Sequence, residues 1–307
     1  MSGQHSGEAK PGEEENAASR PTELRRDIDA VIDQAIGTSP SRHQRLADAM
    51  RYAALGAGKR FRAMLVIAVS DLLGARRGGA LRVAAAIECV HAQSLVHDDL
   101  PCMDDDDLRR GKPTLHRAFD EATAVLAGDA LLALAFEILS DPRTHPEAAV
   151  RGDLVLKLAR TMGQDGLAGG QMLDLFPGDQ ISSEAMILCE MRKTGALIRY
   201  CVEAAAILAG CDDGQRRKLM SFAEKLGLMF QIRDDILDMS GDEKLVGKGL
   251  RKDTAQGKNT ATACLGLEDA NLSAAHLERD CHEALIGFGS QASALHDLAA
   301  FAFQRMH

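Results

Sequence analysis

Two clusters of aspartates are the residues of this chain whose types and spacing could do chemistry. The first begins at Asp98 and Asp99 and resumes at Asp104 as an acidic run that ends at residue 107. The second consists of Asp234, Asp235 and Asp238. Like charges about 4 Å apart repel one another by about 4 kcal/mol at an effective dielectric constant near 20. Cations bound among the carboxylates would offset this repulsion, so both clusters are candidate cation sites.

The second cluster has the spacing of one helix face. Gln231 and the three aspartates that follow it lie at intervals that place all four side chains on a single stripe of a helix. Oxygen ligands without a cysteine pair or a paired histidine motif are typical of Mg²⁺ rather than zinc. Magnesium usually binds one or two carboxylates together with substrate phosphates. The pattern therefore favours Mg²⁺ bound with a phosphorylated substrate.

The first cluster ends a mostly apolar stretch, residues 81–100, which we expect to be a buried central helix. Pro101 should end this helix, because proline disfavours helical geometry in the residue before it. The break lets Asp104 turn back toward Asp98. A lone acidic run is most often a solvated surface, and residues 105–107 fit that interpretation in part. Two aspartate clusters that each end an apolar helix favour the metal site.

Cations beside glycines form the third chemical feature. Residues 56–62 lie at a predicted helix start, where backbone N–H groups favour anions. Other cations of this kind are Arg109, Arg110, Lys112, Lys193 and Lys258. Each one alone is typical of a protein surface. Together they offer several ligands for phosphate oxygens in an otherwise acidic protein.

Two glycines inside a helical pattern, Gly169 and Gly170, leave two interpretations open. The missing side chains either permit close packing of helices or make room for a substrate. In the second case Gln171 and Asp174 would face that substrate.

The elements that position these residues are predicted to be helices throughout. Among 307 residues 46% are hydrophobic, only 4% are aromatic and none is tryptophan, which suits an alanine- and leucine-rich helical protein. Glycine and proline breaks divide the pattern into roughly ten helices, with no alternating strand pattern. We predict a polar, disordered tail over residues 1–21. Residues 22–307 should form a single all-α domain, a helical bundle.

Charge and composition exclude several classes of protein. The formal net charge of −9 argues against nucleic acid as a partner. No apolar stretch is long and uncharged enough to span a bilayer, and the N-terminus lacks a secretory signal. Seven dispersed cysteines are typical of reduced thiols. We therefore expect a cytoplasmic protein without stable membrane insertion.

These motifs resemble those of the trans-prenyl diphosphate synthases, particularly the short-chain bacterial farnesyl and geranylgeranyl diphosphate synthases. The resemblance runs from about residue 42 to the C-terminus and is carried by residues 58–60, 98–116, 169–171, 193–195 and 234–238. It implies an isoprenoid synthase fold, a helical bundle around a central apolar cavity, in a homodimer. It also implies three Mg²⁺ ions, with Mn²⁺ as a substitute, and condensation of isopentenyl diphosphate with an allylic diphosphate, either dimethylallyl or geranyl diphosphate.

The resemblance implies roles for individual residues as well. The principal metal ligands would be Asp98, Asp104 and Asp234, supported by Asp99, Asp235 and Asp238. The allylic diphosphate would bind Arg109, Lys193 and Lys258. Isopentenyl diphosphate would bind a separate, metal-free pocket of Lys59, Arg62, His91 and Arg110. The developing carbocation would face Thr194 and Gln231.

Product length is left between two alternatives. Gln93 and Ser94, just before Asp98, resemble the floor of the product pocket, and a non-aromatic floor would let the chain grow to twenty carbons. The acidic run at residues 104–107 resembles the bacterial farnesyl type, so fifteen carbons ranks first. Arg233, which stands before the second aspartate motif, departs from the family pattern, and its charge is expected to weaken or reshape metal binding.

Two other functions share parts of this pattern. A class I terpene cyclase would have the fold and the first aspartate motif, but it would not need Lys59 and Arg62. A non-catalytic partner subunit tends to lose one aspartate motif, whereas both are intact here. The sequence therefore favours the synthase over either alternative.

Overall fold

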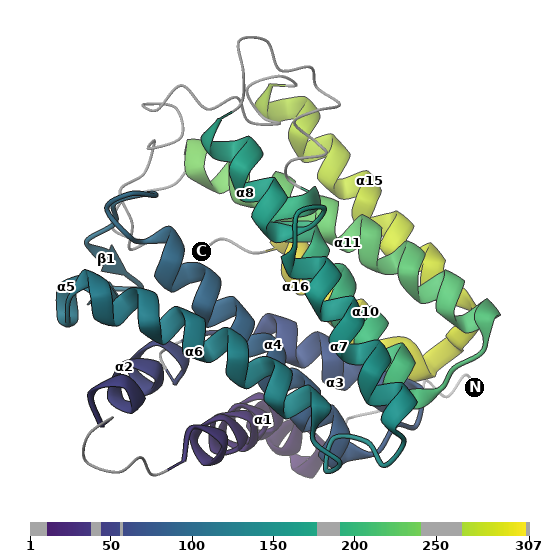
Figure 1. Cartoon of the computed structure of the whole chain (residues 1–307). Coiled ribbons are helices and arrows are strands. Elements are labelled where there is room, and N and C mark those ends of the chain that lie inside the picture. Colours follow the sequence, from purple (N-terminus) through teal and green to yellow (C-terminus); the bar gives the residue numbers. More distant parts are fainter. Residues whose placement is uncertain (1–10, 38–43, 56–57, 177–190, 241–265, 305–307) are drawn as a thin grey trace, which may run out of the picture.

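The computed structural model describes residues 11–37, 44–55, 58–176, 191–240 and 266–304, to which all structural statements refer. Its helices are α1 (Pro11–Ile36), α2 (Gln44–Ala54), α3 (Phe61–Leu72), α4 (Arg77–Asp98), α5 (Leu115–Ala118), α6 (Glu121–Ser140), α7 (Ala148–Met162), α8 (Leu167–Leu175), α10 (Ala196–Ala209), α11 (Asp213–Ser240), α15 (Leu267–Leu285) and α16 (Ser293–Gln304). A π-helical turn, η2 (Met191–Gly195), precedes α10, and a 3-10 segment, η3 (Ile286–Ala292), precedes α16. The predicted all-α fold is confirmed (Figure 1).

Helix α4 is the central helix that the sequence predicted. It packs against α3, α6 and α10, which surround it in Figure 1. Small and branched apolar side chains, among them Val83, Ile87 and Val90, are fully buried on it. The helix begins at Arg77, slightly before the predicted stretch, and ends at Asp98, three residues before Pro101. Most of α4 is buried, and the first aspartate cluster begins at its carboxyl end, where the helix leaves the core.

A short hairpin follows the cluster and is the only β structure in the described residues. Strand β1 (Leu108–Arg109) pairs antiparallel with β2 (Lys112–Pro113). Arg110 and Gly111 connect the strands with φ angles of 53° and 74°. Two successive residues with positive φ form the tight turn that matches the twist of a hairpin. The hairpin fixes where the adjacent arginines point.

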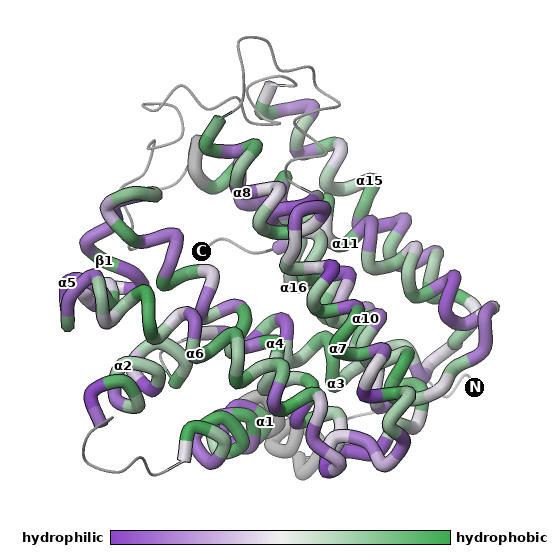
Figure 2. The backbone as a smooth tube through the Cα atoms, in the orientation of Figure 1, coloured by the Kyte–Doolittle hydropathy of each residue, from purple (hydrophilic) through white to green (hydrophobic). Residues whose placement is uncertain are grey.

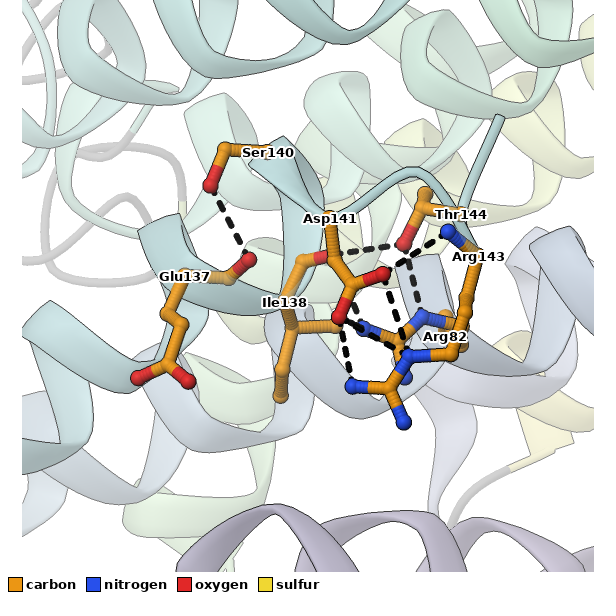
Figure 3. A network of polar contacts seen from close by, with 7 residues as sticks. All are labelled: Arg82, Glu137, Ile138, Ser140, Asp141, Arg143 and Thr144. Carbon is orange, nitrogen blue, oxygen red and sulfur yellow. Dashed lines mark hydrogen bonds and ion pairs between the residues drawn. The ribbon is translucent and has the colours of Figure 1, made fainter. Parts of the chain in front are cut away.

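The loop between α6 and α7 is tied back to the start of α4 (Figure 3). Arg82 donates to Thr144 Oγ1 at 2.8 Å and forms an ion pair with Asp141 at 3.1 Å. Thr144 Oγ1 in turn donates to the carbonyl oxygen of Ile138. A Cβ at Gly79 would lie 2.6 Å from the carbonyl oxygen of Thr144, so only glycine permits this approach. The network holds α4 and α6 in register, far along both helices from the aspartates.

The structure differs from two expectations, one about the N-terminal tail and one about apolar segments long enough to span a membrane. Helix α1 begins at Pro11 and so overlaps the predicted tail, residues 1–21, while the division into tail and domain stays a prediction. Helix α6 is long and apolar enough, by length and composition, to cross a membrane, contrary to the expectation that no segment would be. It carries mainly hydrophobic colours in Figure 2. Because α6 packs along α4, a large part of this apolar surface belongs to the core.

Candidate active site

The first aspartate cluster folds into a tight turn at the end of α4. The backbone N–H of Asp104 donates to the carbonyl oxygen of Asp98 at 2.8 Å, which brings Asp104 back as predicted. Burial raises the pKa of Asp98 to about 6, with Asp104 and Asp99 adding to the shift while Lys193 and Arg109 oppose it. The pKa of a carboxyl rises when its charge lacks solvation, so this site favours an added cation.

We expect Asp98→Asn to stabilise the metal-free protein at about pH 8 but not at about pH 4. The pKa of Asp98 is raised from 3.8 to about 6 in the folded protein. The folded state therefore binds this proton more tightly, and the free energy of unfolding falls as the pH rises between these two values. Asparagine removes that dependence. Melting temperatures at the two pH values measure the effect.

Asp107→Asn is the control for this measurement, because Asp107 is exposed and forms an ion pair with exposed Arg117. Such surface pairs contribute about 0–1 kcal/mol. An equal gain in melting temperature at both pH values for Asp98→Asn would contradict the expectation.

Asp99 and Arg109 bind each other in this structure. The Nε of Arg109 donates to both carboxylate oxygens of Asp99, at 2.7 and 2.8 Å, and Asp99 is buried. Arg109 also lies 3.8 Å from Asp106, which is buried, whereas Asp105 and Asp107 are exposed. The interpretation of residues 105–107 as a solvated surface thus fits Asp105 and Asp107 but not Asp106. The roles of Asp99 in metal binding and of Arg109 in diphosphate binding stay predictions.

Lys193 stands beside the aspartate turn. Its Nζ donates to Asp174 on α8 at 2.6 Å. Burial acts to lower the pKa of Lys193, but Asp174, Asp98 and Asp104 outweigh it, so that the pKa is raised. This ammonium therefore stays charged at the edge of the acidic cluster. Thr194 follows it in η2 and is half-buried.

The paired glycines serve close packing. A Cβ at Gly170 would lie 2.4 Å from the backbone nitrogen of Lys193, so α8 can approach η2 only with glycine there. A Cβ at Gly169 would lie 1.8 Å from the carbonyl oxygen of Gln164. The packing interpretation is confirmed for Gly170, whereas Gly169 packs against the turn that leads into its own helix. Gln171 is buried, and within the described ranges neither of its amide atoms has a hydrogen-bond partner, which leaves a substrate-facing role open.

The second aspartate cluster lies on the last turns of α11, which packs against η2. A Cβ at Gly227 would lie 3.1 Å from the Cα of Gly195, so the two backbones nearly touch. Further along α11, the amide of Gln231 donates to Asp235 at 3.0 Å, and Asp235 is buried while Asp234 is half-buried. The turn η2 thus contacts α11 through Gly195, and its Lys193 lies near Asp98 and Asp104 of the first cluster. The side chain of Asp238 and the whole of Lys258 lie outside the described residues.

Arg233 contacts the C-terminal helices. Its guanidinium donates to Asn271 on α15 at 3.1 Å and lies 5.5 Å from the ring centre of Phe303 on α16. Residues two positions apart on a helix point to different faces. Arg233 therefore faces away from the stripe that starts at Gln231, and its contacts do not support the expected disturbance of metal binding.

The predicted metal-free pocket collects basic groups from three separate segments. Arg62 on α3 lies 3.4 Å from His91 on α4, and a Cβ at Gly58 would lie 2.3 Å from the guanidinium of Arg110. Burial and the four arginines at positions 60, 62, 109 and 110 hold the pKa of His91 well below its usual range. Lys59 is exposed beside them, with its Nζ 5.3 Å from the ring centre of Phe301. The arrangement concentrates positive charge next to the aspartate turn.

Arg60 and Glu88 support this pocket, and the sequence analysis did not single them out for that role. Arg60 donates to buried Glu88 at 2.9 Å, to Asp29 on α1 and to the carbonyl oxygen of Ala54 at 2.6 Å. Glu88 also accepts from the backbone N–H of Ala63 in the first turn of α3. The signal that could have found Glu88 is its single negative charge inside the apolar stretch, one helical turn before His91.

The two residues predicted to form the product floor are buried on α4. The amide nitrogen of Gln93 lies 3.0 Å from Nδ1 of His97, and the hydroxyl of Ser94 donates to the carbonyl oxygen of His91 at 3.0 Å. Both side chains are therefore held in place rather than loose. Whether they limit the product stays a prediction at this point.

Magnesium fits the donors present. Asp98, Asp104 and Asp234 offer carboxylate oxygens, and the raised pKa of Asp98 reports a carboxyl that favours a cation. In the described part of the chain, no three acidic, histidine or cysteine side chains converge closely enough to hold a metal by themselves. Such a site matches a cation that binds one or two carboxylates and completes its shell with substrate phosphates.

Known proteins that this chain resembles in sequence are prenyl diphosphate synthases or belong to their family. The family model described as "Polyprenyl synthetase" matches residues 43–286. Farnesyl diphosphate synthase from Escherichia coli is 44% identical over 283 residues, which cover 90% of this chain and 94% of that protein. Geranylgeranyl pyrophosphate synthase 11 from Arabidopsis thaliana is 43% identical over 256 residues, which cover 81% of this chain and 71% of that protein.

Solved structures agree with this picture. An FPP/GFPP synthase from Zymomonas mobilis superposes with a TM-score of 0.86 at 42% identity, covering 94% of this chain and 99% of that one. A geranyltransferase from Helicobacter pylori, complexed with magnesium and isoprenyl diphosphate, has a TM-score of 0.80 at 32% identity and covers 98% and 100% of the two chains.

Proposed function

We propose that this chain, which belongs to the polyprenyl synthetase family and is a short-chain prenyltransferase, condenses isopentenyl diphosphate with dimethylallyl and geranyl diphosphates to make farnesyl diphosphate. One observation carries the proposal. A basic pocket built from Arg62, His91 and Arg110 adjoins the aspartate turn, and it draws its charge from arginines on α3 and the hairpin. Two neighbouring anion sites of different chemistry suit two diphosphate substrates, whereas a terpene cyclase needs only one.

The allylic substrate would bind between the two aspartate clusters. Mg²⁺, when bound there by Asp98, Asp104 and Asp234, supplies Lewis-acid stabilisation to the leaving diphosphate. Lys193 adds a fixed positive charge beside Asp98, because its pKa is raised. Preorganised charge of this kind stabilises the negative charge that develops as the carbon–oxygen bond breaks. Thr194 and Gln231 would then face the allylic cation with their oxygen atoms.

Isopentenyl diphosphate would bind the basic pocket. Arg62 and Arg110 supply the charge, and neutral His91 accepts a hydrogen bond from Arg62 and so orients its guanidinium. The double bond of this substrate attacks the cation, a carbon–carbon bond forms, and a proton leaves to the released diphosphate. The apolar walls exclude water, which would otherwise quench the cation.

A product of fifteen carbons ranks ahead of one of twenty. The E. coli relative, a farnesyl diphosphate synthase, aligns with this chain over nearly the full length of both proteins. The plant relative, a geranylgeranyl synthase of similar identity, supports the longer product as the alternative. Gln93, a non-aromatic residue at the proposed floor, also supports the longer product, whereas the acidic run at residues 104–107 supports the shorter one.

We also propose a cytoplasmic homodimer without stable membrane insertion. Helix α6 leaves Val125 and Leu126 exposed at 40% and 58% on its outer face. An apolar helix face of this kind favours contact with another apolar surface. A second copy of the chain would cover α6 and account for its membrane-like composition.

Incubation of the purified chain with isopentenyl and dimethylallyl diphosphates is expected to yield linear farnesyl diphosphate with Mg²⁺, and no product after chelation by EDTA. The reason is that breaking the allylic carbon–oxygen bond requires a neutralised leaving group. Chromatography of the dephosphorylated alcohols measures both product and length. A cyclic hydrocarbon product would indicate a terpene cyclase. No product unless a second protein is added would indicate a non-catalytic partner subunit.

A further inference from the structure

A hydrogen-bonded bridge connects α4 to α6 beside the predicted product floor. The amide nitrogen of Gln93 lies 3.0 Å from Nδ1 of His97, and Nε2 of His97 lies 3.2 Å from the carbonyl oxygen of Val125. A carbonyl oxygen only accepts, so Nε2 carries the ring proton. Nδ1 is then the acceptor for the amide of Gln93. The direction of every hydrogen bond in the bridge is thereby fixed.

Gly128 on α6 makes the space for this bridge. A Cβ at Gly128 would lie 2.1 Å from Nε2 and 2.5 Å from Cδ2 of His97. Any side chain there would push the ring away from both of its partners. Glycine inside a helix is conformationally unfavourable relative to alanine. The close approach of His97 accounts for a glycine at this position.

Gln93 is the end of the bridge that belongs to the predicted product floor. It lies five residues before Asp98, about 7.5 Å along the helix axis. The side chain is only 9% exposed, and within the described residues its Oε1 accepts no hydrogen bond. A prenyl chain anchored at Asp98 and growing along α4 would meet this fixed side chain.

We propose that His97 and Gly128 determine product length, because together they hold Gln93 across the path of the growing chain. The inference rests on the proposed function and deepens it. His97 acts as a positioning residue through Gln93, and Gly128 acts by leaving room for His97. Loss of either residue lets the side chain of Gln93 move aside. The space for the growing prenyl chain then becomes longer, so longer products fit.

The variants His97→Ala and Gly128→Ala test the proposal in the full chain with Mg²⁺, isopentenyl diphosphate and geranyl diphosphate. The fraction of product longer than the wild-type product is expected to rise about tenfold, the usual effect of a small change in pocket volume. Total consumption of isopentenyl diphosphate should stay within about twofold of wild type, because both anion sites are intact. Gas chromatography of the alcohols measures both quantities.

Gly152→Ala is the matched control, since Gly152 lies inside α7 and a Cβ there meets nothing within 4 Å. Its products should equal those of wild type. Gln93→Met keeps the length of the side chain but removes its hydrogen bond to His97, so it should lengthen the product like the other two. Unchanged or shorter products in folded, active variants would overturn the proposal.

The wild-type protein offers a measurement that does not depend on the folding of any variant. Nitrogen-15 NMR of labelled histidine should show His97 as the Nε2–H tautomer, and the opposite tautomer would overturn the bridge. The outcomes also separate the two proposals. A wild-type chain that makes no linear prenyl diphosphate contradicts the proposed function, whereas elongation with unresponsive variants contradicts only the role of His97 and Gly128.

Discussion

Asp98→Asn and Asp234→Asn are each expected to lower kcat/KM by about a thousandfold or more, while the fold is retained. Each change removes one carboxylate charge from a different aspartate cluster, and both clusters must hold the cation that neutralises the leaving diphosphate. Asparagine keeps the size of the side chain, so packing at the end of α4 or α11 is preserved. Steady-state kinetics with geranyl diphosphate at saturating Mg²⁺ measures the loss.

The acidic run supplies the control for this experiment. Asp107→Asn changes an exposed carboxylate that pairs with Arg117 at 2.9 Å, outside the turn that joins Asp98 to Asp104. Its kcat/KM should stay within about twofold of wild type, because exposed pairs contribute little. Rates near that of wild type for Asp98→Asn or Asp234→Asn would contradict the shared metal site.

Arg60→Met should lower the free energy of unfolding by about 3–5 kcal/mol, the usual effect of leaving one partner of a buried ion pair uncompensated. Arg60 and Glu88 are both buried and lie 2.9 Å apart, and Arg60 also ties α1 and α2 to the start of α3. The KM for isopentenyl diphosphate should rise as well, since Arg62 and His91 flank this pair. Urea denaturation measures the stability change.

The double variant Arg60→Met, Glu88→Gln should recover more than half of the lost stability. Glutamine carries no charge and can still accept the hydrogen bond from the backbone of Ala63. Arg77→Met, which breaks an exposed pair with Asp71, is the surface control and should change stability by no more than about 1 kcal/mol. An equally small effect of Arg60→Met would show that Glu88 does not depend on this arginine.

The order of helices, the aspartate stripe of the second cluster and the turn of the first were predictable because they depend on local sequence. Apolar spacing determines which side of a helix is buried, and three- and four-residue intervals place Gln231, Asp234 and Asp235 on one face whatever surrounds them. Pro101 allows the chain to turn, and the return of Asp104 to Asp98 follows within a few residues. The family resemblance added roles for these residues that spacing alone does not supply.

The partners of buried polar groups were decided only by the tertiary structure. Arg109 binds Asp99, Arg60 binds Glu88, and Arg233 turns to Asn271 rather than toward the aspartates. The sequence contains several acidic groups that each arginine could bind, and only long-range packing selects one. The same holds for Gly128, whose missing side chain has meaning only because His97 of a different helix occupies the space. Helical periodicity acts over a few residues, whereas these contacts join segments tens of residues apart, and their geometry exists only once the helices have packed.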